Sequence, residues 1–233
     1  MILFGNGENM PSMLEVPSLL DLEKTIAAAF FSCEMPWEAI PKIRESILSL
    51  GETLSADLFL HPACDIWIAK TAVISAWATI QGPCIIDEHA EIRHCAFIRG
   101  SVIVGKHAVV GNSTELKNTV LFDRVQVPHF NYIGDSILGY HSHIGAGGVT
   151  SNVKLDKTNV SVTYPGGRIE TGMKKFGAII GDYAEIGCHC VLNPGTVIGR
   201  GTIVYPCSSV RGYVPEHSIY KGCSNIVGIE PGK

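Results

Sequence analysis

The sequence predicts an all-β fold, a parallel β-helix, from three observations. Apolar residues recur every six positions in two blocks, from Ile68 to Phe122 and from Ile180 to Val210. Four positions after most of them stands a small residue, such as Ala72. Aromatic residues make up only 8% of the chain, which suits a narrow core. A short fixed period with a small corner residue is typical of a solenoid whose stacked repeats bury one continuous core, so function is expected on a face, an edge or an insertion.

The composition of the 233 residues limits the choice of partners. A hydrophobic share of 46% can fill such a core, and a formal charge of −4 gives no reason to expect a nucleic acid or an anionic membrane as partner. The first twenty residues lack a basic segment followed by a long apolar run, so neither a signal peptide nor a membrane span is expected. The protein is therefore expected in the cytoplasm.

Eight cysteines raise the question of disulfides or zinc. Cys84 and Cys190 occupy the small-residue position of their repeats, so they are interpreted as reduced, small hydrophobic residues. Cys188 and Cys190 are separated by one residue, without the two-residue spacing and second pair of a structural zinc site. No metal is expected.

Residues 1–55 follow a different, helical pattern. Pro17 can start a helix that reaches Phe31, and Pro41 can start another that ends at Gly51. This pair is expected to cap an open end of the solenoid, because exposed strand edges need covering. A docking arm for a partner subunit is the alternative.

Residues 56–233 are assigned to the solenoid, with one irregular coil after Phe122. Residues 151–178 then leave the repeat as an excursion with five basic and two acidic residues. A long excursion from a rigid scaffold is usually functional, although a solvated loop is the simpler alternative.

A column of polar residues points to an anion site. Three hexads make one coil, so residues 18 apart stack about 4.8 Å apart on neighbouring coils. Gln81, Arg99 and Lys117 have this spacing. Two stacked cations repel each other unless water or an anion separates them, and phosphate suits such a pair. A solvated column is the alternative.

The segment from His129 to Asn152, HFNYIGDSILGYHSHIGAGGVTSN, carries a family resemblance. It resembles the acetyltransferase half of bacterial N-acetylglucosamine-1-phosphate uridyltransferase and of archaeal sugar-1-phosphate nucleotidyltransferases. TGMKKFGAIIGDYAEIG, which begins at Thr171, resembles the archaeal members in particular. The resemblance covers about residues 66–215. No nucleotide-binding fingerprint precedes the solenoid, so nucleotidyltransferase activity is not expected.

The resemblance implies a left-handed β-helix, a homotrimer with active sites between subunits, and acetyl-CoA as co-substrate. The implied reaction is acetyl transfer to the amine of an amino sugar phosphate. His129 corresponds to the general base, Tyr132 to a residue lining the sugar site, and Glu115 to an acidic residue that orients the imidazole. Arg99 and Lys117 correspond to the cations that hold the phosphate.

The remaining correspondences divide between the acceptor and the cofactor. The acceptor site is expected to include His143, Asn152 and Lys157. The acetyl-CoA site is expected to include Ala146, Gly147, Cys188 and Pro206, largely through backbone groups, and backbone N–H groups of residues 145–147 could stabilise the oxyanion. His143 replaces an asparagine of the family and Lys157 is a displaced loop lysine, so the identity of the acceptor stays open.

Two other functions are compatible with a solenoid. A γ-class carbonic anhydrase needs three histidines around zinc; His89 and His107 are 18 apart and could stack, but no third histidine continues their column. A non-catalytic scaffold or sugar-phosphate sensor is the second alternative, favoured by the altered loop lysines.

Overall fold

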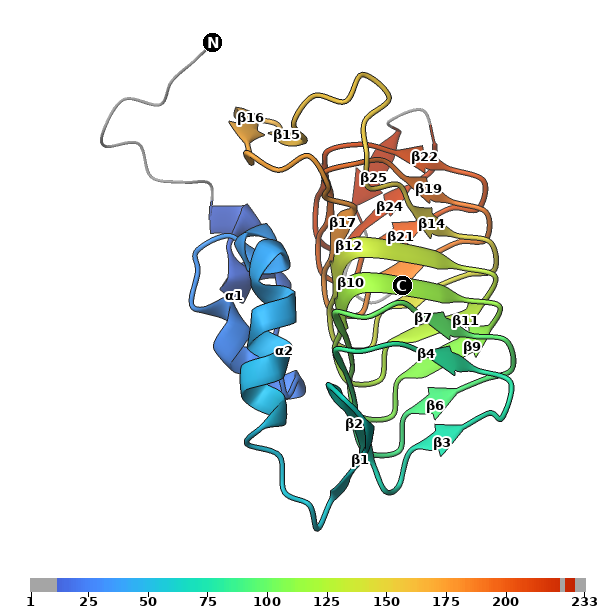
Figure 1. Ribbon diagram of the computed structural model, residues 1–233. Coiled ribbons are helices and arrows are strands. Elements are labelled where there is room, and N and C mark those ends of the chain that lie inside the picture. Colours follow the sequence, from blue (N-terminus) through green and yellow to red (C-terminus); the bar gives the residue numbers. More distant parts are fainter. Residues whose placement is uncertain (1–11, 223–224, 229–233) are drawn as a thin grey trace.

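The computed structural model describes residues 12–222 and 225–228 and shows a left-handed parallel β-helix, with a helical segment along one side (Figure 1). The first eleven residues and Cys223 lie outside this range, so the expectation about a signal peptide rests partly on residues that are not described. The predicted fold class is confirmed.

The coils stack short strands into three flat faces. The first face contains β2 (Ile66–Ala69), β5 (Cys84–Ile86), β8 (Val102–Val104), β10 (Glu115–Leu121), β12 (Tyr132–Leu138), β17 (Ala178–Ile180), β20 (Thr196–Ile198) and β23 (Tyr213–Val214). The second face contains β3 (Val73–Ile74), β6 (Glu91–Ile92), β9 (Val109–Asn112), β11 (Gln126–His129), β13 (His143–Ile144), β18 (Glu185–Ile186), β21 (Ile203–Val204) and β24 (Ser218–Tyr220). The third face contains β4 (Thr79–Ile80), β7 (Phe97–Ile98), the first halves of β10 and β12, β14 (Val149–Thr150), β19 (Val191–Leu192) and β22 (Ser209–Val210).

An antiparallel strand lies at each end of the stack. β1 (Phe59–Ala63) pairs with β2, and β25 (Ile226–Gly228) pairs with β24. Both additions cover backbone groups of a terminal strand that would otherwise have no ladder partner.

The register shows two shortened coils instead of one irregular coil. Ile86 stacks on Val104 at a spacing of 18, but Leu121 then stacks on Val104 and Leu138 on Leu121 at a spacing of 17. The tenth inward residue is therefore Leu121, and the prediction of Phe122 was wrong. The cause is that β10 and β12 each continue from the third face round the corner to the first face. This corner uses one residue fewer than the same corner in the preceding coils. Phe122 points out of the coil, where its ring meets that of Phe31 at 5.5 Å, edge to face.

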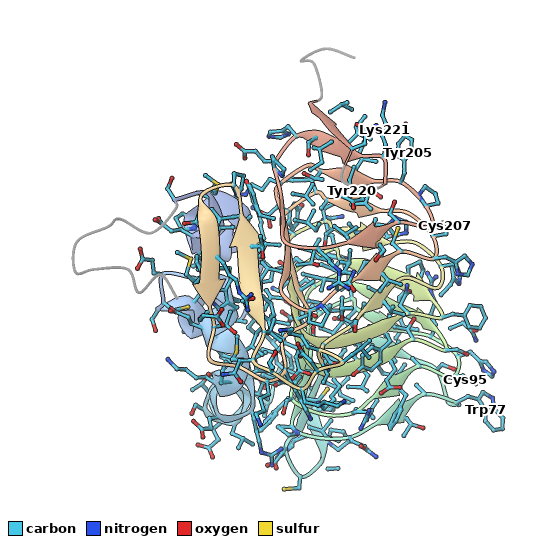
Figure 2. The ribbon with its side chains drawn as sticks, turned by 90° about the horizontal axis from the view of Figure 1, so that it is seen from above. Trp77, Cys95, Tyr205, Cys207, Tyr220 and Lys221 are labelled. Atoms are coloured by element: carbon cyan, nitrogen blue, oxygen red, sulfur yellow. The ribbon has the colours of Figure 1, made fainter. Side chains whose placement is uncertain are left out.

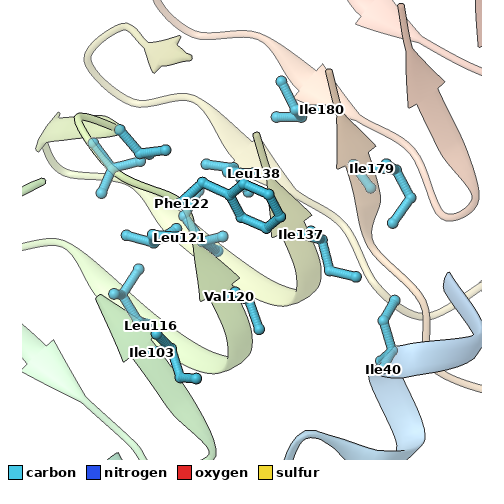
Figure 3. Packing of buried hydrophobic residues seen from close by; sticks show 14 of the residues in the cluster. Ile40, Ile103, Leu116, Val120, Leu121, Phe122, Ile137, Leu138, Ile179 and Ile180 are labelled. Carbon is cyan, nitrogen blue, oxygen red and sulfur yellow. The ribbon is translucent and has the colours of Figure 1, made fainter. Parts of the chain in front are cut away.

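The inward residues of successive coils form one core. Leu116, Leu121, Leu138 and Ile180 are fully buried, as a close view of their packing shows (Figure 3). Burial of each such side chain contributes roughly 1.5–3 kcal/mol, so the stack of repeats supplies most of the stabilisation.

The helical segment is more irregular than its sequence pattern predicts. Its elements are η1 (Ser12–Leu14), α1 (Val16–Leu19), η2 (Leu22–Lys24), η3 (Ala28–Phe31), η4 (Pro36–Lys42) and α2 (Ile43–Gly51). The helix expected from Pro17 to Phe31 breaks because its backbone bonds to the solenoid: the Leu19 carbonyl accepts from Asp182 and the Lys24 carbonyl from Asp123, both at 3.0 Å. The second helix is present as α2.

The segment lies along the first face and does not cover an end of the solenoid, which corrects the expected placement. α2 contacts β5, β8 and β10, and η4 contacts β12 (Figure 1). The reason is a column of outward residues on the first face that are apolar and fully buried: Ile85, Ile103, Val120, Ile137, Ile179 and Val197. The first four belong to the strands that α2 and η4 contact. Leaving this stripe in water would expose a large apolar patch.

A row of polar residues, all of them charged except Tyr140, lines the corner between the first and second faces. We call this row the corner ladder; it contains Lys70, Glu88, Lys106, Asp123, Tyr140, Asp182, Arg200 and Glu216. Opposite charges meet within it, for example Arg200 and Asp182 at 3.1 Å. The ladder also holds the segment, because Asp182 accepts from the Asp21 N–H at 2.8 Å.

Two buried carboxylates at this corner predict a pH dependence of stability. Burial raises the pKa of Asp87 and of Asp182 from 3.8 to about 6. The folded chain therefore holds these protons more tightly than the unfolded chain, so the contribution of both groups to the free energy of unfolding should fall as the pH rises from about 4 to about 6, by up to about 3 kcal/mol each. Urea titrations should show that Asp87→Asn removes its share of the fall. Identical pH dependence in both proteins would contradict this prediction.

Candidate active site

The predicted base and three of the predicted cofactor residues form one row along the corner between the second and third faces. His129, Ala146, Cys188 and Pro206 occupy the same position on successive coils, and we call them the His129 row. Backbone bonds link them: Gly147 N–H donates to the His129 carbonyl at 3.0 Å, and His189 N–H donates to the Ala146 carbonyl at 2.8 Å. Seen from above, Cys207, next to Pro206, lies on the same edge of the molecule as Cys95 and Trp77 (Figure 2).

Two of the three backbone N–H groups that were expected to stabilise the oxyanion already donate to carbonyls of the solenoid. The N–H groups of Gly145 and Gly147 already donate to the carbonyls of Ile186 and His129, at 2.7 and 3.0 Å. Of residues 145–147, only Ala146 has an N–H without a backbone hydrogen bond to the part of the chain that the structure describes. Among these three residues, the Ala146 N–H is therefore the donor that the described part of the chain leaves for a ligand.

The side chain of Asn131 holds the His129 row in place. The sequence analysis did not identify this residue. Its buried side chain accepts from the His129 N–H at 3.1 Å and donates to the carbonyls of Gly145 at 2.8 Å and Gly148 at 3.2 Å. One side chain thus sets the height of His129 relative to the coil that carries Ala146. A polar amide inside the motif HFNYIG was the available signal, because a buried amide needs several partners.

A second group of polar side chains surrounds Asp135. Its buried carboxylate accepts from the amides of Asn118 and Asn152, and the Lys117 ammonium lies 3.6 Å away. Asn152 also donates to the Tyr132 hydroxyl at 3.3 Å. We call these five residues the Asp135 cluster. The structure therefore brings together three predicted residues, Lys117, Tyr132 and Asn152, around a carboxylate that the sequence analysis noted only as part of a motif.

The shortened coils create this cluster. Asn118 and Asp135 sit at the tight corners of β10 and β12 with φ of 49° and 47°, a region that asparagine and aspartate tolerate best among non-glycine residues. Gly134 lets the Tyr132 side chain approach them, since a Cβ there would lie 2.6 Å from the Tyr132 hydroxyl and displace it. Burial, and next the charge of Asp135, raises the pKa of Tyr132. Its phenol is therefore neutral at neutral pH and can donate a hydrogen bond.

The predicted cationic column is in register but is not a free pair of cations. Lys117 stacks on Arg99, as expected from the spacing. Each cation has its own carboxylate: Arg99 meets Glu115 at 2.6 Å, and Lys117 meets Asp135. Intervening carboxylates relieve the repulsion that the sequence analysis assigned to a bound anion. Glu115 consequently contacts Arg99 and makes no hydrogen bond to His129 within the described residues, in contrast to its expected orienting role.

Two predicted acceptor residues lie elsewhere in the single chain. His143 is on the second face, where its Nδ1 lies 2.9 Å from a carboxylate oxygen of Glu185 beside a hollow of about 110 Å³. Lys157 is exposed in the excursion, and its side chain has no ion pair with any residue that the structure describes. Neither belongs to the Asp135 cluster.

The excursion begins and ends at that cluster. Phe176 N–H donates to the Asn152 carbonyl at 3.0 Å, and Gly177 N–H donates to the Asp135 carbonyl at 2.8 Å. Between these points the chain forms an antiparallel hairpin, β15 (Ser161–Tyr164) and β16 (Gly167–Glu170). Phe176 anchors the returning strand against Trp37 of the helical segment, with ring centroids 5.9 Å apart.

Two histidines of the solenoid approach each other without forming a metal site in the described residues. His89 and His107 do stack, with ring centroids 4.9 Å apart. Among the residues placed by the structure, no group of three histidine, cysteine, aspartate or glutamate side chains could hold a metal ion. Within the same residues no helix is both long and apolar enough to cross a membrane.

The fold and its register define a hexapeptide-repeat solenoid, and comparisons with known proteins agree. A family described as the GMPPB C-terminal domain matches residues 66–164. A bifunctional sugar-1-phosphate nucleotidylyltransferase/acetyltransferase of Sulfurisphaera tokodaii is 35% identical over 160 residues, which are 61% of this chain and 40% of that protein. The uncharacterized acetyltransferase YaiX of Escherichia coli K12 is 31% identical over 173 residues, which are 74% of each chain.

The chain belongs to the hexapeptide-repeat acetyltransferase family, together with the acetyltransferase regions of sugar-1-phosphate nucleotidyltransferases. It spans 40% of the length of the Sulfurisphaera relative and 32% of a GlmU protein of Methanococcus vannielii, to which it is 31% identical over 57% of its own residues. A crystal structure of a GDP-perosamine N-acetyl transferase mutant from Caulobacter crescentus, with CoA and GDP-perosamine, aligns at a TM-score of 0.33 and 17% identity, over 70% of this chain and 56% of that one.

Proposed function

We propose that the protein is an N-acetyltransferase that moves the acetyl group of acetyl-CoA to the amine of an amino sugar phosphate. The observation that carries this proposal is the His129 row: an exposed imidazole one coil below the unused N–H of Ala146. The Asp135 cluster lies at the other end of the third face, where β12 turns to the first face, and offers polar groups to a sugar. Family membership supports the class of reaction.

The proposed mechanism assigns one task to each group. His129 removes a proton from the bound ammonium, so that the neutral nitrogen can attack the thioester carbon. The Ala146 N–H donates to the oxyanion of the tetrahedral intermediate, and the neutral Tyr132 phenol, which lies in the Asp135 cluster, donates to the bound sugar. The intermediate collapses and the C–S bond breaks. The coenzyme A thiolate takes up the proton held by His129, and the second proton of the attacking nitrogen passes to solvent. The products are the N-acetyl sugar phosphate, coenzyme A and one proton.

The proposed acceptor phosphate binds at Arg99 and Lys117. Both cations are partly open to solvent, with exposed side-chain fractions of 42% for Arg99 and 28% for Lys117. The pair of Arg99 with Glu115 is partly exposed on both sides and contributes little to stability, so exchanging Glu115 for a doubly charged phosphate costs little.

Removing either cation should weaken acceptor binding. For Arg99→Met and for Lys117→Met we expect a loss of about 1.5–3 kcal/mol, seen as a rise of roughly tenfold to a hundredfold in the acceptor Michaelis constant. The Michaelis constant for acetyl-CoA should barely change. Arg44→Met, on the exposed side of α2, removes the same charge and is the control. If both variants keep the wild-type acceptor constant, the column is only a solvated face.

A homotrimer is part of the proposal. Since His143 and Lys157 lie away from the Asp135 cluster in one chain, a cyclic arrangement in which a neighbour supplies them would complete the acceptor site. Sedimentation equilibrium should report three times the 25.1 kDa chain mass. A monomer would exclude this arrangement.

A coenzyme A release assay with a panel of amino sugar phosphates, free and nucleotide-linked, tests the function as a whole. Release with at least one acceptor is expected. Binding of a sugar phosphate without any release would favour the alternative of a non-catalytic sensor.

A further inference from the structure

Thiols gather at the upper end of the His129 row. Cys188 and Cys207 lie on adjacent coils, and the Cys207 N–H donates to the Cys188 carbonyl at 2.9 Å. Both are exposed, and both are free thiols. Figure 2 shows Cys207 on the outer edge of the solenoid, where a dissolved molecule can reach it.

A third thiol, that of Cys190, lies on the buried side of Cys188 and Cys207. Cys190 is buried, and its Sγ donates to the Tyr205 carbonyl at 3.2 Å. Burial raises the pKa of Cys190, and the nearby sulfurs of Cys207 and Cys188 raise it further, so the three thiols lie within electrostatic range of one another. A buried, protonated thiol is unreactive, whereas exposed thiols can form the thiolate that attacks disulfides.

Metal binding does not account for the three thiols. No group of three metal-ligating side chains exists in the described ranges, 12–222 and 225–228. Packing does not account for the outer two either, because their side chains face solvent. What remains is the chemistry of an accessible thiol pair.

We propose that the pair formed by Cys188 and Cys207 is a modification site for disulfides of coenzyme A. This inference rests on the proposed function, which places coenzyme A along the His129 row. The thiolate of one cysteine attacks a sulfur of the coenzyme A disulfide, the S–S bond breaks, and one coenzyme A leaves as its thiolate. The protein sulfur and the other coenzyme A sulfur form a mixed disulfide, so oxidation of the protein thiol balances reduction of the leaving half.

The attached coenzyme A would occupy the row and exclude acetyl-CoA. Acetyl transfer would then stop when coenzyme A is oxidised and resume after a thiol reductant removes the mixed disulfide. The modification is specific because the reagent binds before it reacts, which raises its effective concentration beside these sulfurs.

The chain contains matched reference thiols for the experiment. Cys95 is exposed on the same edge as Cys207 but lies below His129, and Cys64 is exposed near the start of the solenoid. The folded full-length protein is treated with coenzyme A disulfide or with an equal concentration of glutathione disulfide, and peptide mapping gives the labelling rate of each cysteine.

With coenzyme A disulfide, Cys188 or Cys207 should react at least about tenfold faster than Cys95 and Cys64, and acetyl-CoA should remove this preference. Glutathione disulfide should show no comparable preference. Equal labelling of all four thiols by coenzyme A disulfide would overturn the inference, and would leave the proposed function standing if acetyl transfer is observed. Preferential labelling without transfer to any acceptor would support the modification site and overturn the proposed reaction.

Discussion

Replacing His129 with alanine is expected to lower the turnover number about 10²- to 10⁴-fold, the usual contribution of a positioned general base. An amine at neutral pH is mostly ammonium, and only its neutral form attacks a thioester. The wild-type rate should rise with pH along a limb that disappears in the variant. The fold should be unaffected, because the contacts of His129 to Asn131 and Gly147 use its backbone. Steady-state kinetics over a pH series measure both effects.

His94→Ala is the matched control. His94 lies on the same corner two coils below His129, is exposed, and packs edge-on against Trp77 at 6.3 Å. Its loss should leave the turnover number near the wild-type value. Added imidazole should restore part of the rate of His129→Ala. If His129→Ala retains full activity with every accepted acceptor, another group is the base.

Replacing Asp135 with alanine should have the largest effect on stability. The change leaves two half-buried amides and the Lys117 ammonium without this acceptor, and each polar group left without its partner costs roughly 1–3 kcal/mol. Urea titration of the free energy of unfolding measures the loss. The Michaelis constant for the acceptor should also rise, because Lys117 and Asn152 lose the group that positions them.

The Asp135→Asn variant separates the contribution of the carboxylate charge to stability from that of the side-chain shape. Asparagine tolerates the positive φ of this corner and keeps one oxygen acceptor, so it should lose roughly half as much stability as alanine. Asp156→Ala is the control, since Asp156 is an exposed turn residue in the excursion. An unfolding free energy unchanged by Asp135→Ala would show that the cluster does not depend on this carboxylate.

The fold could be predicted because the repeat is a local rule that every coil obeys. The inward apolar residue and its small partner are set by one coil at a time, so residues 68–116 and 180–210 were read in the correct register. The two shortened sides could not be placed. Phe122 continues the six-residue period from Leu116, whereas Leu121 falls one residue short of it, and only the turns at Asn118 and Asp135 make Leu121 the inward residue.

The sequence contained a signal for the position of the helical segment that the six-residue period alone does not show. Ile85, Ile103 and Val120 recur nearly every 18 residues and precede the inward position, so they point outward from the solenoid. A water-facing strand would carry polar residues there. An apolar stripe on one face only predicts a covered face, and the amphipathic residues 40–50 were available to cover it.

The sequence predicted which residues belong to the candidate site, but only some of the contacts between them. Stacking arithmetic placed Lys117 on Arg99, and the motif identified Tyr132 and Asn152. Pairings such as Arg99 with Glu115 depend on side-chain conformations across coils, which sequence spacing does not determine. Asn131 was missed because its role depends on its being buried. Whether a polar residue at a corner is buried depends on the conformation of the turn, which the repeat does not determine.

The antiparallel strands at the two ends limit how this molecule can associate. A parallel solenoid is an open template: its last coil could accept the first coil of another copy, and repetition would produce a filament. β1 and β25 run against the strands they pair with, so the outer edges they present do not match the register of a further coil. Head-to-tail polymerisation through these two ends is thereby disfavoured, which favours lateral contact through the sides of the prism as a route to assembly.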